Sequence, residues 1–291
     1  MPDPIKVGNV TIHRIVEQEG PFFEMLKFFP KLTQEVLEEN RPWLQPNYMS
    51  AKDEFIICVQ SYLVQTPHHN ILIDTCVGNH KSRKHRPKWD MMNTPYLARL
   101  KAAGVTPDQI DMVMCTHLHV DHVGWNTQLE NGRWVPTFKN AKYIWSQEDF
   151  DFYAKLDKDP EKGPANGGSF RDSVLPVVEA GMAQMVKGGS QLDENLKITP
   201  APGHTPGTIR IEFESKGEKA LFCGDILHHA LQVYHPEWNS FACLDQDNAR
   251  KSRRATIEHV AGSGARLLPC HFGAPFTCHI DHKGAGFVPR F

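Results

Sequence analysis

Residues 116–124 constrain this chain more than any other segment, because they place three imidazoles and a carboxylate within six positions. The segment reads THLHVDHVG and directly follows the apolar run MVMC at 112–115. A strand end delivers the loop after it to a defined place in a fold. Imidazole nitrogen and carboxylate oxygen are ligands that zinc and similar divalent ions prefer. The pattern therefore predicts a metal site on a strand-to-loop turn.

The spacing inside this segment divides its ligands into two pairs. His117 and His119, two residues apart, can turn toward one ion, and Asp121 and His122 can face a second ion close by. Histidines in loops also bond to carbonyls or lie in solvent. Four such groups in this pattern would rarely arise by chance, so we expect the segment to be functional.

Three later segments repeat the arrangement of an apolar strand followed by a single candidate ligand. LKITP leads into a Gly/Pro turn that carries His204. ALFC leads into Gly-Asp at Asp225, and LLPC leads directly into His271. Each is weak alone, since single turn aspartates and histidines are common. Together with the first segment they predict that ligands from four strand ends converge.

The hydrophobic periodicity predicts an alternation of strands and helices. Strands are predicted at 5–17, 55–66, 70–74, 110–115, 141–145, 196–200, 208–214, 219–223 and 265–269. Helices are predicted at 95–103 and 246–262, and in part of 170–187. This order predicts an α/β fold with antiparallel or mixed sheets and outer helices. We expect 1–291 to form one domain, in which the aromatic, proline-interrupted segment 20–50 is a lid, a dimer contact or part of the core.

Composition argues against several kinds of partner. With 32 Lys and Arg against 34 Asp and Glu, the formal net charge of −2 gives no field for nucleic acid or membranes. The basic run 81–88, KSRKHRPK, leaves a local polyanion-binding patch open beside a plain solvated loop. No apolar run approaches the ~20 residues that cross a bilayer. Seven scattered cysteines without a Cys-x-x-Cys pair indicate buried, reduced thiols. We therefore expect a cytoplasmic protein, with export of a trimmed form left open.

In this order, the motifs His-x-His-x-Asp-His, Gly-His-Thr-Pro-Gly, Gly-Asp and a late strand-terminal His resemble the metallo-β-lactamase superfamily, from about residue 54 to residue 275. The resemblance implies a four-layer αβ/βα sandwich with two mixed β-sheets and two divalent ions, zinc first, with manganese, iron or cobalt open. It implies these roles: His117, His119 and His204 on one ion, Asp121, His122 and His271 on the other, Asp225 as the bridge, and Asp74 as a support that orients a ligand imidazole.

Within the superfamily, the residues resemble the branch of N-acyl-homoserine lactonases and methyl parathion hydrolase. Asp225 stands where the best-known zinc β-lactamases carry cysteine, and His119 stands where flavodiiron proteins carry glutamate. The branch implies a hydrolase that uses a metal-bridging hydroxide on a lactone, ester or phosphotriester small molecule. Asp121 would also shuttle the proton to the leaving oxygen, and His228 would contact the substrate, with His229 a weaker candidate. A homodimer is left open.

Three other interpretations share some of these residues. A phosphodiesterase or nuclease of the same fold would grip RNA with the run 81–88. A mononuclear iron dioxygenase acting on persulfides would use only a subset of the ligands. A non-catalytic module would keep the metals for structure alone.

Overall fold

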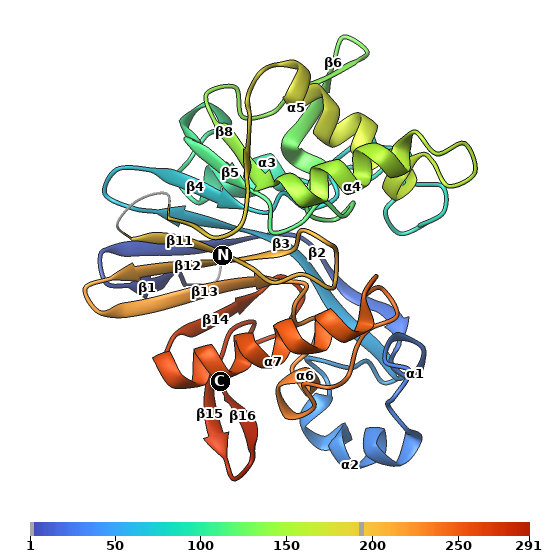
Figure 1. Ribbon diagram of the computed structural model, residues 1–291, viewed down its shortest axis with the longest axis vertical. Coiled ribbons are helices and arrows are strands. Elements are labelled where there is room, and N and C mark those ends of the chain that lie inside the picture. Colours follow the sequence, from blue (N-terminus) through green and yellow to red (C-terminus); the bar gives the residue numbers. More distant parts are fainter. Residues whose placement is uncertain (1–2, 192–194) are drawn as a thin grey trace. The chain divides into compact units, whose positions relative to one another are not determined.

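The computed structural model describes residues 3–191 and 195–291, and Figure 1 labels its elements. The chain divides into two compact units: unit 1 comprises Met1–Glu17 and Val59–Ser190, and unit 2 comprises Gln18–Cys58 and Gln191–Phe291. Two of the three divisions fall inside long strands, β2 (Val10–Glu24) and β3 (Glu54–Gln65), and the third lies between Ser190 and Gln191. The expectation of a single domain over 1–291 stays a prediction.

The strands of unit 1 belong to a seven-stranded sheet in the order β1-β2-β3-β4-β5-β8-β9. Besides β2 and β3, this sheet contains β1 (Ile5–Val7), β4 (Asn70–Ile73), β5 (Met112–Met114), β8 (Lys142–Ser146) and β9 (Ala183–Val186). β3 pairs antiparallel with β4, whereas β4, β5, β8 and β9 run parallel. β4 and β5 are largely apolar and buried, as is typical of parallel strands whose two faces are covered, whereas β9 is partly exposed. The sheet is therefore mixed, as the sequence predicts.

Short helices and a hairpin complete unit 1. The α-helices are α3 (Tyr96–Ala102), α4 (Gln147–Asp157) and α5 (Leu175–Glu179). Three 3₁₀-helices are η1 (Pro107–Gln109), η2 (Gly124–Asn126) and η3 (Ala165–Gly168), and η4 (Phe170–Val174) is a π-helix. The hairpin consists of β6 (Thr127–Glu130) and β7 (Arg133–Pro136). Ser146 caps α4 by accepting from the backbone N–H groups of Glu148 and Asp149. The helix predicted at 95–103 is confirmed as α3.

Unit 2 contains most of a second mixed sheet, in the order β10-β11-β12-β13-β14. Its strands are β10 (Ser190–Gln191), β11 (Leu196–Pro200), β12 (Ile209–Ser215), β13 (Glu218–Gly224) and β14 (Arg266–Pro269). β11, β12 and β13 are antiparallel, and β14 joins β13 in parallel. A hairpin of β15 (His279–Lys283) and β16 (Gly286–Arg290) lies near the carboxyl end. The predicted α/β class with two mixed sheets is confirmed.

The helices of unit 2 include the predicted carboxyl-terminal one. They are α1 (Met25–Phe28), α2 (Gln34–Leu44), α6 (Leu231–Tyr234) and α7 (Gln246–Ser263). Asp245 caps the start of α7 with its side chain, and Gly264 ends it at a φ of 68°, the left-handed conformation that favours glycine. The helix predicted at 246–262 is thus confirmed.

The segment 20–50 contributes to the hydrophobic core of unit 2. Phe28, Phe29, Leu37 and Leu44 are buried there among apolar side chains from the rest of the unit. These side chains therefore belong to the core of unit 2. The roles of the segment as a lid or a dimer contact stay predictions.

Two expectations from composition concern membranes and thiols. Across residues 3–191 and 195–291, no helix combines the length and apolarity needed to span a bilayer. All seven cysteines are buried and carry free thiols, as predicted.

Candidate metal centre

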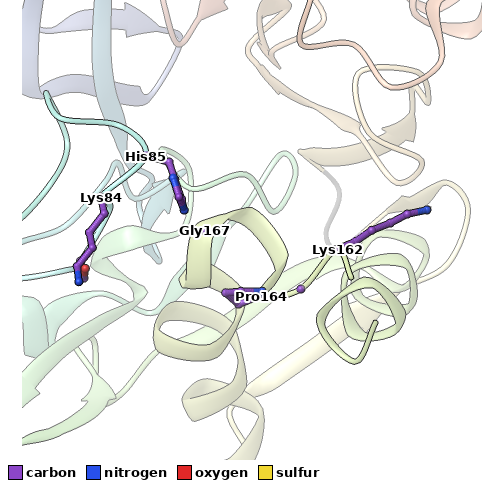
Figure 2. A pocket seen from close by; sticks show the side chains of 7 residues that line it. Lys84, His85, Lys162, Pro164 and Gly167 are labelled. Carbon is purple, nitrogen blue, oxygen red and sulfur yellow. The ribbon is translucent and has the colours of Figure 1, made fainter. Parts of the chain in front are cut away.

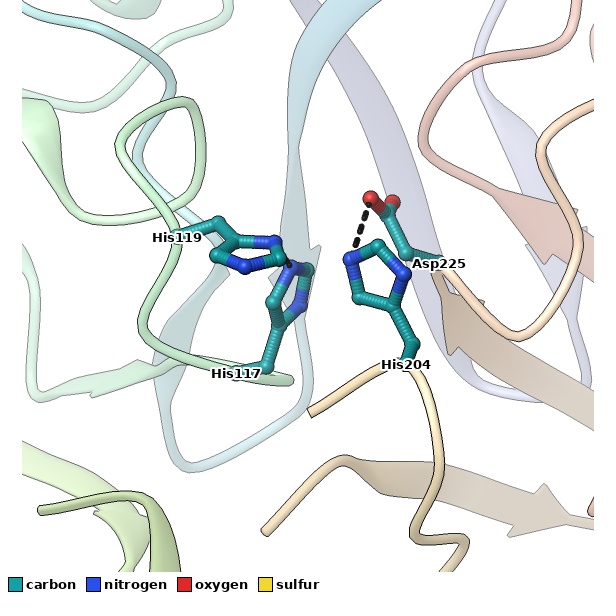
Figure 3. Close-up of side chains that lie close together, drawn as sticks. All are labelled: His117, His119, His204 and Asp225. Carbon is teal, nitrogen blue, oxygen red and sulfur yellow. Dashed lines mark hydrogen bonds and ion pairs between the residues drawn. The ribbon is translucent and has the colours of Figure 1, made fainter. Parts of the chain in front are cut away.

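The loop that follows β5 carries the four predicted ligands of unit 1. His117 and His122 are buried, Asp121 is nearly so, and His119 is half-buried. His117 Nε2 lies 3.0 Å from His119 Nδ1 (Figure 3). Two nitrogens bonded to one tetrahedral zinc lie about 3.3 Å apart. The two imidazoles are therefore arranged to share an ion. Asp121 Oδ2 lies 3.9 Å from His122 Nε2.

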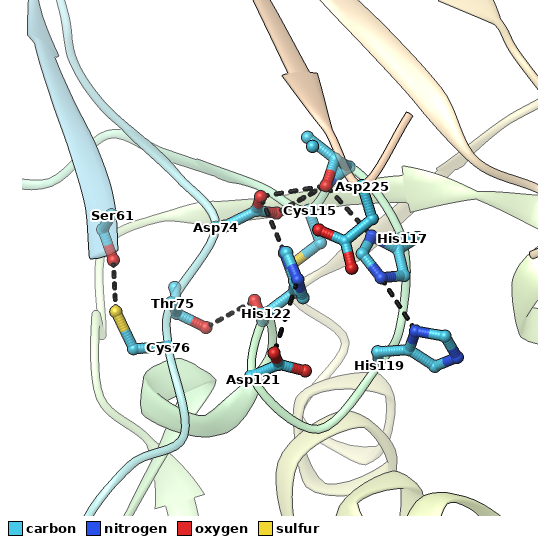
Figure 4. Close-up of polar contacts among 12 residues, drawn as sticks. Ser61, Asp74, Thr75, Cys76, Cys115, His117, His119, Asp121, His122 and Asp225 are labelled. Carbon is cyan, nitrogen blue, oxygen red and sulfur yellow. Dashed lines mark hydrogen bonds and ion pairs between the residues drawn. The ribbon is translucent and has the colours of Figure 1, made fainter. Parts of the chain in front are cut away.

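Asp74, directly after β4, contacts this loop through its carboxylate (Figure 4). Its Oδ1 accepts from the backbone N–H of Thr116 at 2.7 Å, and its Oδ2 lies 3.0 Å from His122 Nδ1. Asp74 has a φ of 57°, which costs a non-glycine residue conformational energy. Because Asp74 holds Nδ1, the Nε2 atom of His122 is the one presented to an ion. The structure thus places Asp74 against a candidate ligand, as the resemblance implies.

The backbone between His117 and His119 is fixed by two residues that sequence reasoning missed. The N–H of Leu118 donates to Asp149 Oδ2 at 3.0 Å, and Asn166 Nδ2 donates to the Leu118 carbonyl at 2.8 Å. Asp149 lies on α4 and Asn166 in η3, 31 and 48 residues from Leu118. Nothing in their local sequence distinguishes them from ordinary polar surface residues.

A buried glutamate, Glu17 of β2, holds the segment after Asp74. It accepts from the backbone N–H of Val77 at 2.7 Å and from the indole N–H of Trp125 at 2.5 Å. Burial raises the pKa of Glu17, although its hydrogen bonds act in the opposite direction. Glu17 thereby ties residues 77–78, shortly after Asp74, to Trp125, which directly follows the candidate metal-binding loop 116–124. The sequence carried no signal for this role.

Three predicted ligands meet in unit 2 around Asp225, at the end of β13. Asp225 Oδ2 lies 3.1 Å from His204 Nε2, and Asp225 Oδ1 lies 2.9 Å from His271 Nε2 (Figure 3 shows the His204 contact). All three residues are buried. Each carboxylate oxygen thus faces a different imidazole, which is the arrangement that a bridging carboxylate requires. Burial acts to lower the pKa of His204, but the Asp225 carboxylate, with Cys243, raises it to about 9.

The two imidazoles of unit 2 are also held at their far nitrogens. His271 Nδ1 lies 2.7 Å from the Cys58 carbonyl oxygen, and His204 Nδ1 lies 3.7 Å from Cys243 Sγ. Metal-binding histidines are typically anchored in this way, with one nitrogen on the protein and the other on the ion. The nitrogen and oxygen donors of both units suit zinc. The residues present therefore fit the divalent ions that the sequence predicts.

His228 and His229 follow Asp225 but have different surroundings. His228 is buried, with Nε2 3.3 Å from Asp225 Oδ2, and burial lowers its pKa to about 4, so the ring is neutral at neutral pH. His229 Nδ1 accepts from the Leu231 N–H at 3.0 Å, and His229 Nε2 lies 3.3 Å from the Tyr48 carbonyl. His229 is thus a structural residue, whereas His228 lies beside the candidate ligands.

Two cations of the basic run 81–88 are paired inside the protein, whereas Lys84, Arg86 and Lys88 are exposed. Arg83 makes two hydrogen bonds to Asp172, at 2.6 and 2.8 Å. Lys81 is fully buried, donates to Thr127 Oγ1 at 2.8 Å, and has a pKa lowered by burial to about 7. Two of the cations are therefore unavailable to phosphate. Lys84 and other exposed residues of the run line a shallow groove of about 320 Å³ with residues 162–164 and 167 (Figure 2).

The chain belongs to the metallo-β-lactamase superfamily. Residues 59–271, more than half of the 291, match this family. The N-acyl homoserine lactonase AiiB of Agrobacterium fabrum is 30% identical over 99 residues, which cover 29% of this chain and 35% of that protein. The chain thus aligns with about a third of the length of this curated relative. The resemblance predicted from the motifs is confirmed.

Solved structures of the same fold align over nearly the whole chain. The hydrolase AbOPH of the β-lactamase superfamily matches with a TM-score of 0.81 at 24% identity, covering 99% of this chain and 96% of that one. AidC, a dizinc quorum-quenching lactonase, matches with a TM-score of 0.77 at 21% identity, with the same coverage. These likenesses show that the chain has the metallo-β-lactamase fold.

Proposed function

We propose that the protein is a binuclear metal-dependent hydrolase that cleaves a lactone, ester or phosphotriester bond in a small molecule. The proposed metal ligands are His117, His119, Asp121, His122, His204, Asp225 and His271. Two zinc ions are the first choice, because the donors are imidazole nitrogens and carboxylate oxygens. Membership of the superfamily and the lactonases among its relatives support this proposal.

One observation carries the proposal: the carboxylate of Asp225 faces a different imidazole with each oxygen. If the Asp225 carboxylate interacted with only one histidine, its second oxygen would not need to lie buried against a second imidazole. His204 and His271 follow different strands, β11 and β14, so their meeting at Asp225 is a property of the fold. We infer that this carboxylate joins two ions.

The chemistry divides between the ions and the side chains. When bound, the ions would lower the pKa of a water toward neutrality and polarise the substrate oxygen. Asp121 would carry a proton to the leaving oxygen. His228, neutral and beside Asp225, would contact the substrate through an imidazole hydrogen bond. Neither role requires a charged histidine.

A nuclease is the main alternative, and the pairing of Lys81 and Arg83 with Asp172 argues against it. Such an enzyme needs cations that reach the phosphate backbone, and affinity that falls steeply with salt. A mononuclear iron dioxygenase would leave part of the seven-residue ligand set without a role. We therefore favour hydrolysis of a small neutral or weakly charged substrate.

A substrate panel on the zinc-loaded enzyme tests the proposal. The panel comprises an acylated lactone, an aryl ester, a phosphotriester and a phosphodiester, with the chelator-treated protein as the control. We expect turnover of one of the first three substrates, lost on chelation and restored by zinc. Preference for the phosphodiester with salt-sensitive RNA binding would favour the nuclease. Absence of turnover with zinc, manganese, cobalt and iron would contradict hydrolysis.

The proton role of Asp121 has its own test, Asp121→Asn with metal content measured beside kcat. A shuttle residue contributes about 10²–10⁴-fold, so kcat should fall by that factor while both ions stay bound. An unchanged kcat with both ions bound would remove Asp121 from proton transfer.

A further inference from the structure

His204 is held from two sides by groups of very different chemistry. Its Nε2 atom faces Asp225 Oδ2 at 3.1 Å, and its Nδ1 atom faces the sulfur of Cys243 at 3.7 Å. Both Cys243 and His204 are buried, so solvent does not compete for these contacts. The sulfur lies within the distance at which it forms a hydrogen bond.

The segment that carries Cys243 is fixed on the turn that carries His204. The Leu244 N–H donates to the His204 carbonyl at 3.1 Å, and the Asp245 N–H donates to the Gly203 carbonyl at 2.9 Å. A Cβ on Gly203 would lie 2.1 Å from the backbone nitrogen of Ala249, so the start of α7 packs directly on this turn. The contact between sulfur and imidazole is therefore built into the backbone.

Further hydrogen bonds hold both the backbone and the thiol of Cys243 in place. Gln246 Nε2 donates to the Cys243 carbonyl at 2.9 Å, and the Ser240 hydroxyl lies 3.6 Å from the sulfur. The side chain therefore has a defined position beside the ring. Cys243 carried no signal in the sequence, because it belongs to no cysteine motif and lies 39 residues from His204.

We propose that Cys243 is a positioning residue for metal binding, whose sulfur accepts a hydrogen bond from His204 Nδ1. An imidazole that gives its Nε2 lone pair to an ion must carry its proton on Nδ1. An acceptor at Nδ1 therefore fixes both the tautomer and the orientation of the ring. The inference rests on the proposed function, since it requires His204 to be a ligand. It makes a thiol do what Asp74 does for His122 and the Cys58 carbonyl does for His271.

The test compares zinc affinity in three variants, measured by competition with a chromophoric chelator. Cys243→Ala removes the acceptor, Cys243→Ser keeps one, and Cys278→Ala truncates another buried cysteine of unit 2 as a matched control. Loss of such a partner typically weakens metal binding about 10–100-fold. We expect that loss in Cys243→Ala, partial recovery of the affinity in Cys243→Ser, and wild-type affinity in Cys278→Ala. The absorption spectrum of the cobalt-loaded protein should change in Cys243→Ala alone.

The outcomes separate positioning from simple packing. Wild-type zinc affinity in Cys243→Ala would overturn the inference. Equal loss in the Ser and Ala variants, in step with lower melting temperatures of the metal-free proteins, would also overturn it. Should Cys243→Ala not fold, Cys243→Val replaces it, because valine fills the space without accepting a hydrogen bond. Failure of the wild type and of Cys278→Ala to bind zinc, manganese, cobalt or iron would instead refute the proposed function and the inference with it.

Discussion

The imidazoles of three proposed ligands differ in the group that holds their second nitrogen. His122 has the Asp74 carboxylate, His271 has the Cys58 backbone carbonyl, and His204 has the Cys243 sulfur. A carboxylate is the strongest acceptor of the three, because its charge strengthens the hydrogen bond. A backbone carbonyl cannot be removed by side-chain mutation. The metal site should therefore be most sensitive to change at Asp74.

Asp74→Asn tests this sensitivity. Asparagine keeps one acceptor oxygen, but its amide must face either the Thr116 N–H or His122 Nδ1, which Asp74 now bonds at 2.7 and 3.0 Å. We expect zinc affinity to fall about 10–100-fold and the free energy of unfolding to fall by about 1–3 kcal/mol. Competition titration and chemical denaturation measure the two effects. Asp108→Asn, at an exposed position of the same unit, is the control, and equal behaviour of the two variants would contradict the account.

The burial of Lys81 leads to a prediction about how the stability of the fold depends on pH. Burial lowers its pKa from 10.5 to about 7. Between these two values the unfolded chain holds a proton that the folded chain has released, so stability gains from this residue as pH rises from about 7 to about 10. In Lys81→Met, where no proton is held, this gain should be absent. Denaturation of both proteins across this range measures the difference, with the exposed Lys84→Met as the control. Parallel pH profiles of wild type and Lys81→Met would show that the burial has no such effect.

At the scale of elements, the sequence predicted those with strong local signals. The apolar runs became β4, β5 and β8, and helix α7 has the Asp245 and Gly264 caps that its ends require. The stretch 170–187 is helical only to Glu179 and then forms β9, because pairing with β8 overrides helix propensity. The predicted strand at 5–17 is divided by a turn into β1 and β2.

The candidate site likewise contains residues that the sequence could predict and residues that it could not. His117, His119, Asp121 and His122 could be predicted because they lie together in one motif. Asp149, Asn166, Glu17 and Cys243 could not, because each acts on a partner at least 31 residues away through a single hydrogen bond or a small network. Only the folded chain brings these pairs together.

Gly124, the last residue of the candidate metal-binding loop 116–124, packs against residues 76–77, and this close contact leads to a prediction at the scale of elements. A Cβ there would lie 1.8 Å from the Val77 carbonyl oxygen, so the two segments would have to separate. The hydrogen bond from the Gly124 N–H to the Cys76 carbonyl, at 2.7 Å, would then lengthen or break. We expect Gly124→Ala to lower the free energy of unfolding by about 1–3 kcal/mol and to weaken zinc binding.

The matched control for Gly124→Ala is Gly262→Ala, on α7, where an added Cβ meets no atom within 4 Å. Alanine favours a helix over glycine by up to about 1 kcal/mol, so this variant should be neutral or more stable. Thermal unfolding of both variants measures the contrast. A Gly124→Ala protein as stable as the wild type would contradict the close packing of the two segments.

At the scale of the whole molecule, the seven proposed ligands are divided between the two units. Unit 1 supplies His117, His119, Asp121 and His122, and unit 2 supplies the other three. The fold class and the family could be predicted, because the candidate ligands follow predicted strands in the order that is typical of the superfamily. The natural substrate could not be predicted, because the recognised motifs contain only proposed metal ligands.

Metal stoichiometry of the purified protein tests the central claim most directly, with one ligand removed from each unit. The account predicts two equivalents of metal per chain in the wild type and in His68→Ala, an exposed control. It predicts loss of at least one equivalent in both His117→Ala and His204→Ala, since each removes a ligand of the same proposed ion. Fewer than one equivalent in the wild type, unchanged by added zinc, manganese, cobalt or iron, would contradict the account, as would full occupancy in either ligand variant.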